Sequence, residues 1–163
     1  MKPVRKLKND FYPSVSVVIA ARNEEKNIEQ RIRNILEQDY PKEKLELIIV
    51  SDGSTDNTED IVTQMIEEAE KLTPERYSSL KLIQNERSRG KPFSINQGVL
   101  ASKGEFVVFA DCRQRFSQNA IQQLVNNFID ENVGCVSGEL IFEKMAGSSI
   151  QAEMGANWNF EKW

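Results

Sequence analysis

The chain contains no histidine among its 163 residues. General acid–base catalysis by histidine and metal ligation by histidine are therefore excluded for this chain. Any chemistry must come from carboxylates, lysine, arginine and backbone groups.

Cysteine is also scarce. Cys112 and Cys135 are the only two, and they show neither CxxC nor zinc-ligand spacing. Each lies in or beside an apolar segment that is typical of a strand. We therefore expect reduced, buried thiols in a cytosolic compartment and no disulfide framework.

Long apolar runs and an excess of positive charge are absent as well. No stretch reaches the roughly 18–20 apolar residues that span a bilayer, and Met1–Asp10 is too polar for a signal peptide. These features predict a soluble chain. The net charge of -4 gives no basic field for nucleic acid. The one basic cluster lies in residues 1–12 and is interpreted as a solvated polar tail, although contact with anionic phosphate or lipid head groups stays open.

What the sequence does contain is an alternation of short apolar runs and amphipathic segments. The runs are rich in β-branched residues and nearly continuous, which suits strands buried on both faces. The predicted strands are Val15–Ala20, Leu45–Val50, Leu80–Ile83, Glu105–Ala110 and Val133–Phe142. Apolar residues at helical spacing predict a helix after the first, second and fourth of these strands. Pro92 suits the first turn of a helix after the third, running to about Ala101. This order predicts one α/β domain with a mostly parallel sheet flanked by helices.

Charged or amide side chains follow four consecutive predicted strands. In an open parallel sheet, ligands bind beyond the carboxyl ends of the strands. The four groups together indicate a polar ligand that includes anionic groups. The candidate binding residues are Arg22, Asn23, Glu24, Asp52, Lys91, Asp111 and Arg113.

Each candidate also has a structural interpretation that the sequence leaves open. Asp52 either accepts hydrogen bonds from a nucleobase or ribose, or caps its turn. Asp56 is interpreted as the N-cap of the next helix. Lys91 at a helix start either binds a diphosphate or is an ordinary exposed lysine. Asp111 either caps a turn or binds ribose and a divalent metal, and Arg113 either neutralises a diphosphate or pairs with surface carboxylates.

Four motifs, in this order, resemble those of family 2 glycosyltransferases. They are Ser14–Glu25, Ile49–Thr58, Arg89–Asn96 and Val108–Arg113, and the second is the most specific. The resemblance runs from about residue 13 to the end of the chain. It implies a GT-A (Rossmann-like) fold in which residues 13–163 form the nucleotide-sugar-binding part, incomplete at the C-terminus.

The resemblance also implies roles for individual residues. Residues 22–24 and Asp52 would contact the nucleoside, usually uridine, and Lys91 would lie near the base or the diphosphate. Asp111 matches the first carboxylate of the DxD motif, close to ribose and a divalent cation, Mn²⁺ or Mg²⁺. In this family a later carboxylate acts as general base, and single displacement from a nucleotide-diphosphate sugar inverts the anomeric carbon.

Two departures from the family pattern matter. Arg113 stands at the second DxD position, so either Asp111 holds a metal weakly by itself or Arg113 replaces part of the metal's charge. No convincing general base follows, since the remaining candidates are Glu139, Glu143, Glu153 and Glu161. We expect the base beyond Trp163, and a chain that binds nucleotide but transfers no sugar.

Other classes of protein fit less well. A dinucleotide-binding domain requires GxGxxG after its first strand, where residues 21–26 contain no glycine. A P-loop would need glycine at Asn85 and serine or threonine at Pro92. A degenerate GT-A domain that serves as a non-catalytic binding or scaffolding module stays open as the alternative function.

The resemblance leaves the acceptor undefined, whether glycan, lipid or polysaccharide. Many relatives carry transmembrane helices after this domain. A full-length protein anchored to the membrane, with this domain facing the cytosol, is therefore an expectation by analogy.

Overall fold

The computed structural model describes residues 11–72 and 80–140 of the chain. Its centre is a four-stranded sheet with the order β3-β2-β1-β4. All three pairings are parallel. The strands are β1 (Val15–Ala21), β2 (Leu45–Ser51), β3 (Leu80–Gln84) and β4 (Phe106–Ala110).

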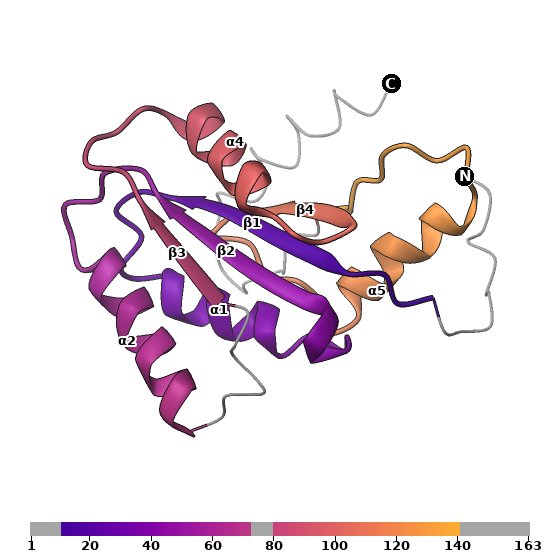
Figure 1. Ribbon diagram of the computed structural model, residues 1–163, viewed down its shortest axis with the longest axis horizontal. Helices are drawn as coiled ribbons and strands as arrows, with labels where there is room; N and C mark the ends of the chain where they lie inside the picture. The colour runs from indigo at the N-terminus through magenta and orange to yellow at the C-terminus, as the bar shows by residue number, and fades with distance from the viewer. Residues whose placement is uncertain (1–10, 73–79, 141–163) are drawn as a thin grey trace, which may run out of the picture.

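Helices cover both faces of this sheet (Figure 1). The described helices are α1 (Ile28–Leu36), α2 (Thr58–Leu72), α4 (Lys91–Ala101) and α5 (Ala120–Val125), with short 3₁₀ helices η1 (Lys42–Lys44) and η2 (Asn126–Ile129). Figure 1 shows α4 on one face and α1 with α2 on the other.

Alternation along the strands divides the core into two layers. Val17 and Ile19 of β1 pack in the larger layer with apolar residues of α1, α2 and α5. Val18, between them in the sequence, points to the other face and packs with Ile48 and with Ile95 of α4. A strand buried on both faces needs a continuous apolar run, and this explains why the sequence signal for β1 and β2 is so clear.

The first four predicted strands and the parallel α/β architecture are confirmed. The predicted strand Val133–Phe142 is wrong over residues 133–140, which form no strand; residues 141–142 lie outside the described part of the chain. Apolar alternation does not suffice there, because a strand also needs a partner for its backbone groups. Among the described residues, β4 pairs with β1 alone.

The expectation of buried thiols is confirmed for one cysteine and wrong for the other. Cys112 is buried directly after β4, whereas Cys135 is exposed because its segment joins no sheet.

Candidate functional site

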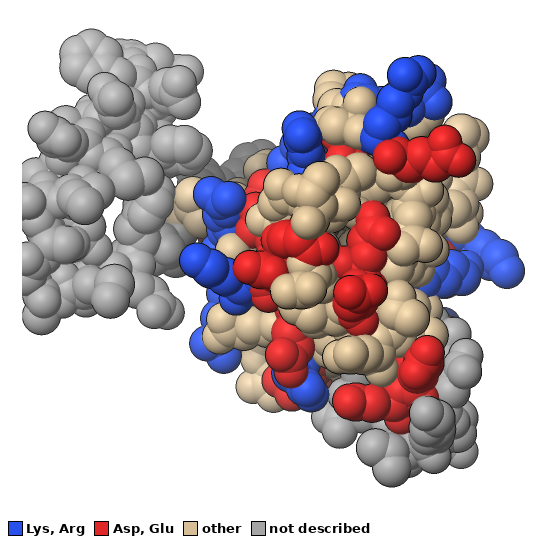
Figure 2. Space-filling view, turned by 90° about the vertical axis from the view of Figure 1, so that its left-hand side faces the viewer, with Lys and Arg blue, Asp and Glu red and all other residues tan. Residues whose placement is uncertain are grey.

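Four loops meet at the carboxyl edge of the sheet: 22–27 after β1, 52–57 after β2, 85–90 after β3 and 111–119 after β4. Parallel strands place these loops at the same edge, on the left-hand side of Figure 1. Figure 2 looks onto this side, where Lys and Arg lie beside Asp and Glu. The topology therefore brings together all seven candidate residues.

Asp52 lies directly after β2 and is 5% exposed. Its carboxylate accepts hydrogen bonds from the backbone N–H groups of Arg89 (2.8 Å) and Gly90 (2.9 Å). The hydroxyls of Ser88 (2.7 Å) and Ser94 (3.0 Å) donate to it as well. Both carboxylate oxygens are thus engaged by the loop between β3 and α4.

Burial of Asp52 acts to raise its pKa, but the hydrogen bonds from Arg89, Ser88, Gly90 and Ser94 outweigh it and hold the pKa far below its ordinary value. The carboxylate is therefore ionised at neutral pH and holds the loop through charge-assisted hydrogen bonds. A direct contact between Asp52 and a nucleoside stays a prediction.

The β1–α1 loop is bound to the β2–α2 loop in a similar way. Asn23, which has a left-handed backbone with φ of 54°, accepts the N–H of Thr55 at 2.8 Å. The N–H of Glu24 donates to the hydroxyl of Thr58 at 2.8 Å. Asp56 accepts the N–H of Thr58, the first residue of α2, at 3.0 Å. It therefore binds the start of the helix, but the N-cap position is Asn57, so the predicted N-cap is wrong by one residue.

Two ion pairs join the remaining candidates across the edge. Lys91 Nζ lies 3.0 Å from Asp111 Oδ2, and Arg113 Nε lies 2.9 Å from Glu24 Oε1. Lys91 is the first residue of α4, so it adds a positive charge to the N-terminal end of that helix. Burial of Asp111 acts to raise its pKa, but the contacts with Lys91 and Arg113 outweigh it and lower the pKa.

Sequence reasoning missed Arg31, a buried cation behind this edge. It is 2% exposed, and its guanidinium carbon lies 4.2 Å from the ring centroid of Phe116. Burial lowers its pKa to about 10, while Cys112 and Asp111 act in the opposite direction. The sequence signal for its burial was its position, because Arg31 follows Ile28 by three residues and so lies on the apolar face of α1.

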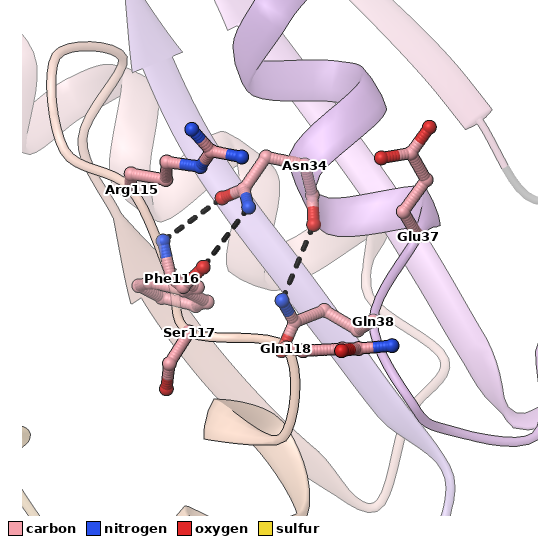
Figure 3. A pocket seen from close by; sticks show the side chains of 7 residues that line it. All are labelled: Asn34, Glu37, Gln38, Arg115, Phe116, Ser117 and Gln118. Atoms are coloured by element: carbon pink, nitrogen blue, oxygen red, sulfur yellow. Dashed lines mark hydrogen bonds between the residues drawn. The ribbon is translucent and has the colours of Figure 1, made fainter.

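Two hollows of the surface only partly coincide with this edge. One cavity of about 340 Å³ lies between α1 and the β4–α5 loop (Figure 3). Its lining residues are Asn34, Glu37, Gln38, Arg115, Phe116, Ser117 and Gln118. A second cavity of about 340 Å³ lies against the β3–α4 loop and is lined by Gln84, Asn85, Glu86, Arg87 and Arg89. The second borders the predicted site, and the first does not include any candidate residue.

The described residues do not provide the usual carboxylate set for a divalent cation. In residues 11–72 and 80–140, no three His, Cys, Asp or Glu side chains come together as a possible metal site. Asp111 already accepts hydrogen bonds from Lys91 on one oxygen and from the N–H of Arg113 on the other. Of the candidate bases, Glu139 is exposed, and Glu143, Glu153 and Glu161 lie outside the described residues.

The chain belongs to glycosyl transferase family 2, whose family model matches residues 16–161. It is 33% identical over 131 residues to "Probable glycosyltransferase YdaM" of Bacillus subtilis, covering 78% of this chain and 29% of that protein. It is 31% identical to the beta-monoglucosyldiacylglycerol synthase of a Nostoc species, covering 76% of this chain and 25% of the synthase. The chain therefore spans less than a third of the length of these curated relatives.

Solved structures show the same fold. The mannosyltransferase PcManGT from Pyrobaculum calidifontis, in complex with GDP-Man and Mn²⁺, matches 78% of this chain and 36% of its own, with a TM-score of 0.70 and 32% identity. TarS 1-349 of S. aureus in complex with UDP matches 83% of this chain and 40% of its own, with a TM-score of 0.59 and 27% identity. The GT-A fold expected from the sequence motifs is therefore confirmed.

None of the described helices is long and apolar enough to cross a membrane.

Proposed function

We propose that this chain is the donor-binding part of a glycosyltransferase that takes a nucleoside-diphosphate sugar, a UDP-sugar, for inverting transfer to an acceptor hydroxyl. The observation that carries the proposal is the placement of Lys91 and Arg113 at the carboxyl edge, beside Asp111 and the start of α4. Two cations and a helix N-terminus are groups that favour the binding of a diphosphate. Relatives solved with UDP and with GDP-Man support this donor class.

The proposal assigns roles to the loops. Residues 22–24 and the loop held by Asp52 contact the nucleoside, and the cavity beside Arg89 lies next to that loop. Lys91 and Arg113 bind the diphosphate, which becomes the leaving group when the acceptor hydroxyl attacks the anomeric carbon. Asp111 binds the ribose in this proposal. The domain comprises residues 13–163, with residues 1–12 as a polar tail.

The affinity for UDP should depend on Lys91. A charge-assisted hydrogen bond to phosphate contributes about 1.5–3 kcal/mol, so Lys91→Ala should weaken UDP binding roughly 10- to 100-fold. Titration calorimetry of the full-length protein with UDP and, separately, GDP measures this. The matched control is Lys103→Ala, since Lys103 is exposed before β4 at the opposite edge of the sheet. Equal losses in both variants, or no nucleotide binding by the unaltered protein, contradict the proposal.

The 163-residue chain by itself should not transfer sugar. Transfer requires a carboxylate that deprotonates the acceptor hydroxyl, and we place that general base beyond Trp163. Incubation with radiolabelled UDP-sugars and separation of products would detect transfer or donor hydrolysis. Measured turnover by this chain would contradict the assignment of the base.

A second candidate function is a degenerate domain that binds or scaffolds without catalysis. Arg113 at the second DxD position favours it, because a carboxylate usual in the family is replaced by a cation. Nucleotide affinity does not separate the two functions, whereas sugar transfer by the full-length protein does.

We place the domain in the cytosol, acting on a glycan, lipid or polysaccharide acceptor, with any membrane contact made by segments outside this chain.

A further inference from the structure

We propose that this site neutralises the donor diphosphate with Lys91 and Arg113 and not with a divalent cation, so that nucleotide binding does not depend on Mn²⁺ or Mg²⁺. The inference rests on the proposed function, because it specifies how that donor site holds its ligand. Four residues carry it: Glu24, Lys91, Asp111 and Arg113, which we call the ion-pair quartet.

The two carboxylates of the quartet have both oxygens engaged by protein donors. Asp111 accepts from Lys91 Nζ at 3.0 Å and from the backbone N–H of Arg113 at 3.2 Å. Glu24 accepts from Arg113 Nε at 2.9 Å and from the side-chain amide of Asn27 at 2.7 Å. A divalent cation prefers carboxylate and water oxygens, and it would have to displace these donors.

The charge balance opposes a divalent cation more strongly than the hydrogen bonds do. Aspartate at both DxD positions would give two negative charges, whereas the charges of Asp111 and Arg113 cancel. Asp111 also interacts with the charges of Lys91 and of the buried Arg31. The quartet and Arg31 together hold three positive side chains and two carboxylates, so a divalent cation would enter a site without net negative charge. This count does not depend on the rotamers of the exposed side chains.

The same cations are available to a diphosphate. The side chain of Lys91 is 60% exposed and that of Arg113 is 73% exposed, so both can turn toward a ligand without leaving a buried position. The pair of Lys91 with Asp111 is a surface ion pair, which is weak and breaks readily. Glu24 is only 12% exposed, but it keeps the hydrogen bond from the side-chain amide of Asn27 when Arg113 turns away. Lys91 is also the first residue of the 11-residue helix α4, whose N-terminal N–H groups add positive potential. An anion with several charges should therefore displace Asp111 and Glu24 from their partners.

Arg113→Asp should convert the site into one that needs a metal. Titration calorimetry of the full-length protein with UDP is carried out in EDTA and again in excess Mn²⁺. The unaltered protein should show the same dissociation constant within about twofold. Arg113→Asp should bind UDP at least about 10-fold more weakly in EDTA and recover most of that loss in Mn²⁺, because a second carboxylate joins Asp111. Electron paramagnetic resonance of Mn²⁺ should detect bound ion in this variant alone.

Arg115→Asp is the matched control, since it makes the same charge change on an exposed residue two positions along the same loop. It should leave UDP binding within about threefold of the unaltered protein in both buffers. UDP binding by the unaltered protein in Mn²⁺ but not in EDTA would overturn this inference and leave the proposed function standing. The unaltered protein is titrated with GDP in the same two buffers, and absence of both UDP and GDP binding would overturn the proposed function itself, and this inference with it.

Discussion

Replacement of Asp52 by alanine should lower the free energy of unfolding by about 2–4 kcal/mol. Its carboxylate is 5% exposed and receives hydrogen bonds from two backbone N–H groups and two hydroxyls of residues 88–94. Alanine leaves these donors without their acceptor. The loop that precedes Lys91 then loses its anchor to β2, so UDP affinity should fall even if Asp52 itself does not contact the ligand.

The stability that Asp52 provides should depend on pH in a defined direction. Its pKa is lowered in the folded state, because the hydrogen bonds outweigh the effect of burial. The carboxylate therefore contributes its full stability above its unfolded pKa of about 4, and this contribution is lost as the pH falls toward the lowered value. The difference in unfolding free energy between the unaltered protein and Asp52→Ala should be constant from pH 8 to 5 and shrink in stronger acid.

Urea unfolding at several pH values measures both effects, with Asp39→Ala as control because the Asp39 side chain is exposed. Asp52→Asn is a second useful variant. It preserves the shape but turns an amide group toward N–H donors, so it should not restore the loss. If Asp52→Ala keeps full stability and loses only UDP binding, Asp52 acts by direct contact with the nucleoside and not through the loop.

Much of the architecture was predictable because its signals are local. The runs in β1 and β2 are apolar on both faces, and buried parallel strands leave that pattern in any sequence. Parallel strands then place the following loops at one edge, so Asp52, Lys91 and Asp111 could be grouped without coordinates. A short-range rule also placed Asp56 at the start of α2, although it missed the N-cap position, Asn57, by one residue.

The contents of the site were less predictable, because they depend on partners distant in the sequence. The donors to Asp52 come from residues 88–94, and an aspartate before a glycine gives no sign of them. Arg113 could be seen to replace a carboxylate, but not to pair with Glu24. The segment 133–140 has the apolar alternation of a strand without a sheet partner in the described residues, so the local rule failed there.

Gly53→Ala should destabilise the protein by about 2–4 kcal/mol and weaken UDP binding in parallel. Gly53 has φ of 65°, which costs about 1 kcal/mol for a residue with a side chain. A Cβ atom there would lie 2.5 Å from the backbone nitrogen of Ser88 and 2.6 Å from the carbonyl carbon of Arg87. Overpacking of this kind typically costs about 1–3 kcal/mol.

The effects of Asp52→Ala and Gly53→Ala on the free energy of unfolding should also be coupled. The sign of this coupling tests whether Asp52 holds the 88–90 loop in place. In the unaltered protein, the carboxylate of Asp52 holds the 88–90 backbone against Gly53, so a new methyl group cannot be relieved by loop movement. Once Asp52→Ala has released the loop, the methyl group should cost less, and the double variant should be about 1–2 kcal/mol more stable than additivity predicts.

Gly104→Ala provides the control for that cycle. Its Cβ would collide with the backbone nitrogen of Ser16, but at the opposite edge of the sheet, so its effect should add to that of Asp52→Ala. Urea unfolding of the unaltered protein, the three single variants and the two double variants gives both cycles. If the effects of Gly53→Ala and Asp52→Ala also add, residues 85–90 keep their place without Asp52. The loop would then be held from the β3 and α4 ends, and the carboxylate would be free for another role.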